Sequence, residues 1–284
     1  FMNKKYKRVF SINLQPGYRN YTVKDLQDIK GKKKLTQILV NDALEASAAE
    51  EAGVDLILAK PDENVPLIRK AAPKTFMTVS VPFIKYSSKE DIVKKALELV
   101  EHGADSIHCG SWNLNFMKYL NEFKIPFQGH AGLVPRRSTW IGGVRAFGKN
   151  AKEASKLLKD VKDIEETGAW GVEVECVPEE ILGEITKQTE LLTLSIGSGK
   201  KSDVQFLFAE DILGCSSIDT PRHAKMYADF NKLNNQIQKE RIKAFKKFNL
   251  EVKKGVFPGK KHSIGVDKKE LINFKKLLQD KKDN

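Results

Sequence analysis

The feature that most limits how this chain can fold is a short pattern that occurs three times. EAGVDLILA (51–59), EHGADSIHC (101–109) and ETGAWGVEVEC (166–176) each begin with the end of a charged amphipathic stretch. A glycine follows, and then a run of small and β-branched residues. This layout is typical of a helix that ends at a left-handed glycine and leads into a short buried strand. The repeat therefore predicts parallel strands that alternate with helices on the outside.

Several other segments have the composition of buried strands. They are LTQILV (35–40), TFMTVSV (75–81), IPFQGH (125–130) and LLTLSIG (191–197). With the three repeats they give about seven strands, and VQFLFA (204–209) is a candidate eighth. A single (βα)₈ barrel of the TIM type fills a chain of this length. An open, doubly wound sheet is the alternative, because periodicity does not distinguish a closed sheet from an open one.

The chain is predicted to have one domain with short additions at its ends. Residues 1–20 are expected to form an N-terminal extension, and residues 21–265 the barrel with a long helix from Tyr227 that stops near Gly255. Residues 266–284 are lysine-rich and are expected to form a last helix and a tail.

Composition excludes some classes of protein and favours others. No apolar stretch approaches the roughly 20 residues of a membrane-spanning helix, and no secretory leader is evident. The three cysteines are widely spaced, which argues against a disulfide framework and favours a reducing cytoplasm. The net charge of +12 comes from lysines spread along the whole chain. A nucleic-acid partner is therefore less expected than ordinary solvated lysines.

In a barrel of this kind, functional groups gather at the carboxyl ends of the strands. The side chains at those positions are Asp42, Asp62, Ser80, His108, Cys109, His130, Glu175, Ser195, Ser198 and Asp203.

Glu175 is the strongest candidate for a catalytic group. It lies in VEVEC, where Val172, Val174 and Cys176 alternate with Glu173 and Glu175. A carboxylate among strand residues at the barrel mouth would be partly removed from water, which makes it a better proton acceptor. A surface glutamate at a frayed strand end is the alternative.

His130 and the segment after the seventh strand are further candidates. His130 lies between glycines in QGHAG, where it could be a ligand or an electrophile, or a hydrogen-bonded core histidine. SIGSGKKSD (195–203) could offer backbone N–H groups to an anion, or it could be a plain turn.

Six motifs in order resemble the ketopantoate hydroxymethyltransferase family. They are YTVKDLQDIKGKKK with AAEEAGVDLIL, GHAGLVPRRSTWIGGVRAFGK (129–149), VECVP (174–178), IGSGKKSDVQFLFAEDILG (196–214), TPRHAKMYAD (220–229) and GVFPGKKHS (255–263). The resemblance implies a (βα)₈ barrel of the phosphoenolpyruvate/pyruvate type and a homodecamer. It also implies Mg²⁺ as cofactor, methylenetetrahydrofolate as one-carbon donor and 2-oxoisovalerate as substrate, on the route to pantothenate.

The resemblance also assigns roles to residues. Glu175 occupies the position of the family's catalytic base, His130 that of a loop histidine and Asp203 that of an aspartate after a strand. Substrate contacts are expected from Asp42, Ser80, His108, His130, Ser195 and Asp203, and Asp62 is the expected metal ligand.

Several positions depart from the family pattern. Lys60 and Pro61 stand at the family's Gly-Asp-Ser string, so a shift of one residue is needed to make Asp62 a ligand. Ser80 replaces the second metal-binding aspartate, and His108 replaces a substrate-binding lysine. The site could therefore bind a metal other than Mg²⁺, or none. A different 2-oxo acid as substrate and a non-catalytic assembly subunit are the alternatives to the family reaction.

Overall fold

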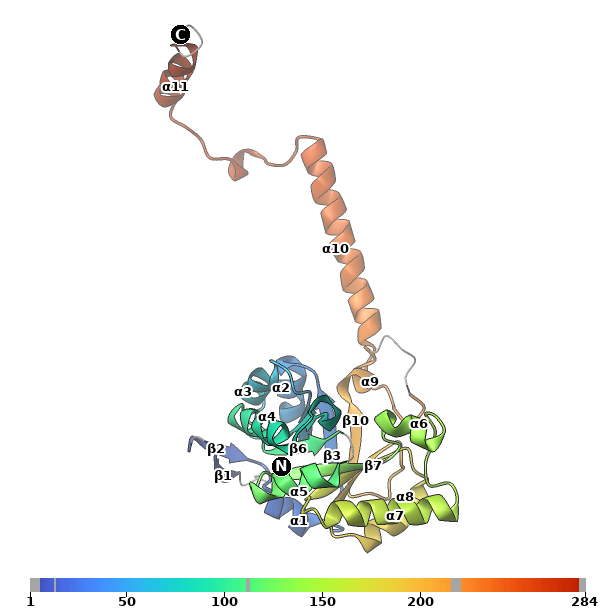
Figure 1. Cartoon of the computed structure of the whole chain (residues 1–284). Helices are drawn as coiled ribbons and strands as arrows, with labels where there is room; N and C mark the ends of the chain where they lie inside the picture. Colours follow the sequence, from blue (N-terminus) through green and yellow to red (C-terminus); the bar gives the residue numbers. More distant parts are fainter. Residues whose placement is uncertain (1–5, 13, 111–112, 216–220, 281–284) are drawn as a thin grey trace. The chain divides into compact units, whose positions relative to one another are not determined.

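Eight parallel strands form a closed barrel in the computed structural model, which describes residues 6–12, 14–110, 113–215 and 221–280 (Figure 1). In order around the barrel the strands are β3 (Leu35–Val40), β4 (Leu56–Ala59), β5 (Phe76–Val81), β6 (Ser106–Cys109), β7 (Phe127–Gly132), β8 (Gly171–Glu175), β9 (Leu192–Ile196) and β10 (Val204–Phe208). The ring closes because Val204 pairs with Leu194 on one side and with Leu35 on the other. The predicted barrel is confirmed, and the open sheet is excluded.

Helices cover the outside of the barrel and alternate with its strands (Figure 1). They are α1 (Val23–Ile29), α2 (Ala43–Glu51), α3 (Val65–Ala71), α4 (Lys89–Glu101), α5 (Leu114–Glu122), α6 (Ser138–Ile141), α7 (Ala151–Glu165), α8 (Glu179–Gln188) and α9 (Ala209–Leu213), with short 3₁₀ turns at Phe83–Lys85 and Pro135–Arg137. The glycines of the repeated pattern, Gly53, Gly103 and Gly168, have φ values of 78°, 104° and 89°. They end α2, α4 and α7 in the left-handed conformation that the sequence predicts.

The inside of the barrel is apolar near the start of the strands and carries both polar and apolar side chains higher up. Below the mouth, Gln37, Thr78 and Gln128 are buried, and their side-chain polar atoms have no hydrogen-bond partner in the described part of the chain. The next inward-facing side chains on β6 and β8 are His108 and Glu173, which are also buried. The alternation of strand side chains thus places a polar layer directly below the mouth.

A two-stranded hairpin that the sequence did not predict precedes the barrel. Antiparallel β1 (Lys7–Phe10) and β2 (Pro16–Arg19) form it. The guanidinium of Arg19 lies 2.8 Å from the carboxylate of Asp105, which Arg69 also contacts at 2.8 Å. This ion-pair group attaches the hairpin to the segment that leads into β6.

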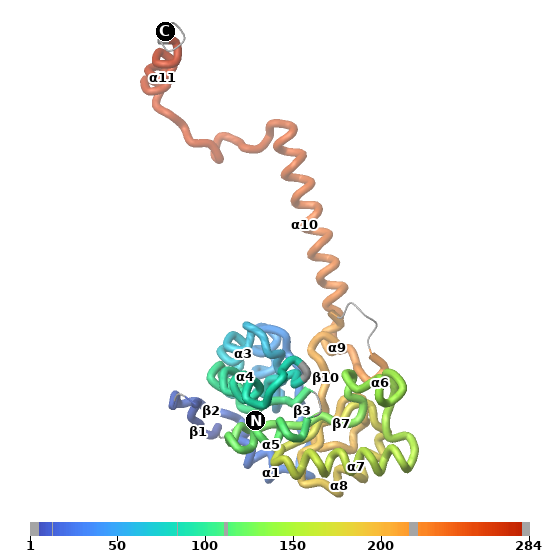
Figure 2. Tube along the Cα trace, viewed as in Figure 1, coloured from blue at the N-terminus to red at the C-terminus, as the bar shows by residue number. Residues whose placement is uncertain are grey.

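The chain divides by its contacts after Ala228, and the second unit comprises residues 229–284. It contains α10 (Phe230–Lys253), a 3₁₀ turn (Lys260–His262) and α11 (Lys268–Asp280). Figure 2 follows α10 as one uninterrupted helical run. None of the described residues of α10 is buried. The domain boundaries expected at residues 20 and 265 stay predictions.

Within the described ranges, no helix combines the length and the apolar character that a membrane crossing requires.

Candidate active site

A cavity of about 600 Å³ opens at the carboxyl ends of the barrel strands. Its polar lining comes from side chains on four consecutive strands and consists of Ser80, His108, His130, Glu173 and Glu175. Ser80 lies on β5, His108 on β6, His130 on β7, and both glutamates on β8. The mouth of a barrel therefore holds a compact group of titratable side chains, as active sites of this fold do.

The rest of the cavity has an apolar wall and a charged rim. The wall comes from Leu39, Leu58, Ile196, Phe206 and Phe208. The charged rim comes from Lys60, Asp62, Lys85 and Arg136. Three cations against one carboxylate favour a small anion at the entrance, and the wall favours an alkyl group beyond it.

Glu175 and His130 form a direct pair on the floor of the cavity. The Oε2 atom of Glu175 lies 3.1 Å from Nε2 of His130, and this contact is a hydrogen bond. The same nitrogen lies 3.5 Å from Oε1 of Glu173. Burial by itself lowers the pKa of His130, but the negative charges of Glu173 and Glu175 raise that pKa above its ordinary value overall. The two carboxylates therefore make protonation of His130 easier than burial alone would allow.

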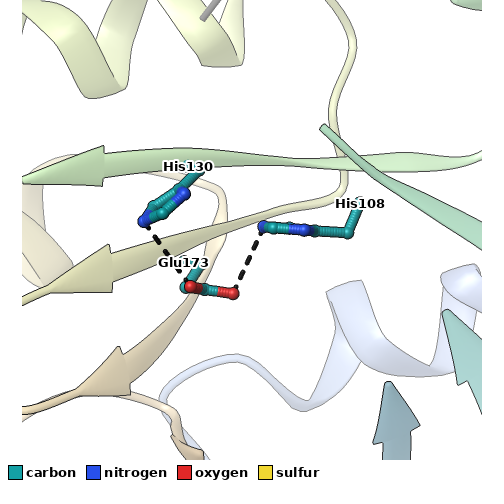
Figure 3. A group of neighbouring side chains, drawn as sticks. All are labelled: His108, His130 and Glu173. Atoms are coloured by element: carbon teal, nitrogen blue, oxygen red, sulfur yellow. Dashed lines mark ion pairs between the residues drawn. The ribbon is translucent and has the colours of Figure 1, made fainter. Parts of the chain in front are cut away.

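The pKa of His108, in contrast, is lowered. Burial, helped by the positive charges of His130 and Arg136, lowers the pKa of His108 to about 3, so its ring is neutral near pH 7. Its Nδ1 atom lies 3.0 Å from Oγ of Ser80, and its Nε2 atom lies 3.2 Å from Oε2 of Glu173. Figure 3 shows the Glu173 carboxylate facing both imidazole rings.

Glu173 is fully enclosed by these neighbours. Burial raises its pKa to about 7, and the nearby charge of Glu175 adds to this rise, whereas His130 opposes it. Glu173 is 5% exposed, whereas the side chain of Glu175, at the end of the same strand, is 18% exposed. Glu173 and Glu175 therefore have different environments on one strand.

The backbone around Glu175 is held in an uncommon conformation. The next residue, Cys176, has a φ of 50°, a left-handed value that is unfavourable for a side chain of this kind. Its N–H donates to the carbonyl oxygen of Ile196 at 2.9 Å, and its own carbonyl accepts from the N–H of Phe147 at 3.1 Å. These bonds on both sides keep the end of β8 in place.

Four of the site residues predicted from the sequence lie together in the cavity: Ser80, His108, His130 and Glu175. Asp62 also lines it, at the rim, where its Oδ1 atom accepts a hydrogen bond from the N–H of Asn64 at 2.9 Å. The functional roles of these residues stay predictions.

The other three predicted residues lie elsewhere. Asp42 caps the start of α2, where its side chain accepts from the N–H groups of Leu44 and Glu45. Ser195 donates to the carbonyl of Gly199 at 2.8 Å and lines a second cavity.

Asp203 stands just before the first residue of β10, at the opposite end of that strand from the mouth. Its carboxylate contacts Lys30 Nζ at 3.0 Å and accepts from the N–H groups of Gly31 and Thr193. These contacts make Asp203 part of the base of the barrel and not of the lining of the mouth cavity.

The sequence analysis missed Glu173 as a site residue. Glu173 and Glu175 are two positions apart on β8, so alternation places both side chains on the inner face. That signal was present in VEVEC.

The second cavity, of about 820 Å³, lies beside the first and shares Phe206 with it. Lys149, Arg222 and Lys225 line it together with the single carboxylate of Glu179. Its charge therefore also favours an anionic ligand.

Comparisons with known proteins agree on one family. Residues 63–260 match the sequence profile described as ketopantoate hydroxymethyltransferase. A 3-methyl-2-oxobutanoate hydroxymethyltransferase from Kosmotoga olearia is 34% identical over 260 residues, which cover 84% of this chain and 95% of that protein. The enzyme of the same name from Pyrococcus furiosus is 32% identical over 278 residues, or 90% of this chain and 95% of its own.

Solved structures with a similar fold are more distant in sequence. A phosphonomutase-like protein from Burkholderia cenocepacia superposes with a TM-score of 0.54 at 11% identity, covering 67% of this chain and 93% of that one. An oxaloacetate acetylhydrolase gives a TM-score of 0.51 at 9% identity, covering 83% of this chain and 98% of that one. At these identities the likeness concerns the barrel fold alone.

Proposed function

Because this chain belongs to the ketopantoate hydroxymethyltransferase family, we propose that it transfers a hydroxymethyl group to the enolate of a small 2-oxo acid such as 2-oxoisovalerate. The observation that carries the proposal is the Glu175 carboxylate, hydrogen bonded to His130 at 3.1 Å on the floor of the mouth cavity. A carboxylate in this position can act as a general base toward a carbon acid.

The lining of the cavity supports an acid of this shape. The carboxylate of a 2-oxo acid would be attracted to Lys60, Lys85 and Arg136 at the rim. Its branched alkyl group would contact Ile196 and Phe206 on the apolar wall. In this orientation the carbon next to the carbonyl faces the floor of the cavity, where Glu175 lies.

The reaction divides into two steps. In the first, Glu175 takes a proton from C3 of the 2-oxo acid, and the electron pair of the broken C–H bond moves to the carbonyl oxygen. His130, when protonated, stabilises the resulting negative charge, and Glu173 and Glu175 favour that protonation by raising the pKa of His130. In the second, the enolate carbon forms a C–C bond to the methylene carbon of the donor, and both C–N bonds that hold this carbon in the donor break. Water gives its hydroxyl group to the same carbon, and the proton of water and the proton held by Glu175 go to the two nitrogen atoms of the departing donor.

Methylenetetrahydrofolate, implied by the family, is the proposed one-carbon donor. The second cavity supports a large anionic co-substrate because it adjoins the first and carries Lys149, Arg222 and Lys225. Ser195 contributes to the lining of the same cavity.

Mg²⁺, the metal implied by the family, does not fit the residues at the mouth. Mg²⁺ requires oxygen ligands in octahedral geometry. The hydroxyl of Ser80 is hydrogen bonded to His108, and the Asp62 carboxylate at the rim accepts a hydrogen bond from the backbone. The donors that gather are the imidazoles of His108 and His130 with Glu173. The steps above are therefore assigned to protein groups alone.

We propose that the protein is a homo-oligomer and that it works in a reducing cytoplasm. Apolar side chains along α10 are exposed, among them Phe245 at 71% and Phe248 at 57%. Such a stripe is costly in water unless another protein surface covers it. The family implies that the cover is a second copy of the same chain. The three cysteines, all described, are free thiols.

The proposal is tested by proton exchange at C3 of 2-oxoisovalerate in deuterated water, followed by NMR. Exchange above the buffer rate is expected without any one-carbon donor, because proton removal precedes bond formation. A panel of straight and branched 2-oxo acids identifies the preferred substrate. If no acid of the panel exchanges its C3 proton above the buffer rate, with or without divalent metals, enolisation is rejected and a non-catalytic homologue is favoured.

A further inference from the structure

The most unusual chemistry in the described chain lies beneath the proposed base. His108, His130 and Glu173 lie on adjacent strands and are 5%, 6% and 5% exposed. Each offers one donor atom, and these atoms lie within 4.8 Å of one another. The group is therefore built into the barrel wall and is not a chance cluster on the surface.

Two of the three donor atoms have no hydrogen-bond partner among the described residues, whereas the third, Nε2 of His130, is bonded to Glu175. Nε2 of His108 and Oε2 of Glu173 lie 3.2 Å apart, yet neither has a hydrogen-bond partner within the described residues. A buried polar atom without a partner costs roughly 1–3 kcal/mol, so native structures seldom keep one unless something else binds there. Figure 3 shows that these atoms point toward one another.

Ser80 gives His108 the form of a metal ligand. Its hydroxyl lies 3.0 Å from Nδ1 of His108 and can accept the Nδ1–H hydrogen. A neutral ring that donates through Nδ1 presents a lone pair at Nε2, which is the atom that faces Glu173. Metal-bound histidines commonly have such a partner on the other ring nitrogen.

We propose that His108, His130 and Glu173 bind one first-row transition-metal dication, of the Zn²⁺ or Co²⁺ type, through two imidazole nitrogens and one carboxylate. This donor set suits borderline-soft cations and does not suit Mg²⁺. Three protein ligands leave further coordination positions, and the cavity lies on their open side.

Metal binding would also change the partner of Glu175. Nε2 of His130 now holds Oε2 of Glu175 at 3.1 Å. Binding of a dication at this nitrogen would end that hydrogen bond and leave Glu175 without its partner on His130.

The test uses the full chain, purified and stripped with a chelator. Calorimetric titration with Zn²⁺, Co²⁺ and Mg²⁺ in turn is expected to give one ion per chain, with Co²⁺ and Zn²⁺ at least about 100-fold tighter than Mg²⁺. The visible absorption of bound Co²⁺ reports nitrogen ligands and coordination number directly. Equal affinity for Mg²⁺, or no binding of any of the three ions, overturns the proposal.

Variants locate the site. His108→Gln and Glu173→Gln should each weaken Co²⁺ binding at least about 10-fold and change its spectrum. His102→Gln, on an exposed ring at the end of α4, is the matched control and should change neither. A folded His108→Gln protein with the wild-type Co²⁺ spectrum contradicts the assignment.

A second measurement covers variants that fail to fold. Ser80→Ala keeps all three ligands, and it should weaken Co²⁺ binding by about 10-fold while the thermal unfolding of the stripped protein stays close to wild type. Unchanged affinity in this variant would count against a neutral ring oriented by Ser80. The inference is independent of the reaction, because bound Co²⁺ without C3 exchange would reject the proposed function and leave the metal site standing.

Discussion

The backbone N–H of Leu133 donates a hydrogen bond to the main-chain oxygen of Glu175 at 2.8 Å. This bond joins the ends of β7 and β8, the two strands that carry His130 and Glu175. Gly132, which precedes Leu133 at the end of β7, has a φ of 84°. A Cβ atom on Gly132 would collide with the main-chain oxygen of Glu175. The two side chains of the pair are thus aligned by the backbone as well as by their own contact.

Gly132→Ala should destabilise the barrel and displace the base. Both the positive φ and the collision oppose the new methyl group, so a loss of more than about 2 kcal/mol in unfolding free energy is expected. Gly142→Ala is the matched control, because Gly142 has a φ of 82° but nothing within 4 Å of an added Cβ. It should lose only about 1 kcal/mol. Urea unfolding measures both, and equal losses would show that the contact with Glu175 does not matter.

Glu175→Gln should abolish proton exchange at C3 while the protein stays folded. The amide has nearly the shape of the carboxylate but does not accept the proton, so a fall of about 100-fold or more is expected. The NMR exchange assay measures it. Glu184→Gln, which removes an exposed carboxylate paired with Lys187, is the control and should keep the wild-type rate. Wild-type exchange in Glu175→Gln would mean that another group is the base.

Asp203→Asn should destabilise the protein in a pH-dependent way. Burial alone raises the pKa of Asp203, but the N–H of Thr193 and the charge of Lys30 lower it below its ordinary value overall. The stabilisation by this carboxylate is therefore complete above the unfolded-state pKa and is lost as pH falls through the folded-state pKa. A deficit of about 3 kcal/mol at pH 7 is expected, and it should shrink below about pH 4.

Denaturant unfolding from pH 3 to pH 7 checks this prediction. Asp28→Asn, on an exposed side chain paired with Lys24, is the control and should cost less than about 0.5 kcal/mol at every pH. A stable Asp203→Asn protein with a raised KM would instead support the substrate-binding role that the family resemblance implies.

Asp105→Ala should strongly destabilise the N-terminal face of the barrel. It leaves the guanidinium groups of Arg19 and Arg69 without their shared partner, and each of these side chains is only 12% exposed. Removal of one member of a buried ion pair costs about 3–5 kcal/mol. Asp163→Ala, which removes the partner of the exposed Lys159, should cost less than about 0.5 kcal/mol. Thermal unfolding of the two variants side by side distinguishes the outcomes.

Phe245→Asp should reduce the number of subunits without unfolding the barrel. Phe245 is 71% exposed in a single chain, so a charge there is tolerated unless a second copy covers it. Light scattering after gel filtration should give a lower mass than wild type. Lys246→Asp, at the next position of α10, is the control. An unchanged mass for Phe245→Asp would exclude this face from the assembly.

Much of the fold could be predicted from the sequence because several strands directly follow a helix whose end is visible in the sequence. A glycine that ends a helix and a run of β-branched residues are local signals, and they placed β4, β6 and β8 close to their observed bounds. Closure of the barrel was not a local signal. It depends on the pairing of β10 with β3, which are far apart in the chain.

The site was predicted less completely, and particular residues show why. Glu175 is the last residue of β8 and His130 lies two residues before the end of β7, so position alone indicated the mouth. Asp42 also follows a strand, but its carboxylate is used as a helix cap, which a reading by position does not separate from a site residue. Glu173 lies deeper on β8, and its importance depends on two imidazoles from other strands, which only the assembled barrel brings near it.

The left-handed conformation of Cys176 has a consequence for how this protein tolerates change. Hydrogen bonds to Ile196 and Phe147, which lie on two different segments, keep the main chain of Cys176 in this conformation. Without them it would relax to a more favourable φ value. Mutations that loosen either segment would let the end of β8 move and would displace the carboxylate of Glu175, the proposed base. A mutational survey should therefore find activity lost at positions that never touch a substrate, while the folded yield stays normal.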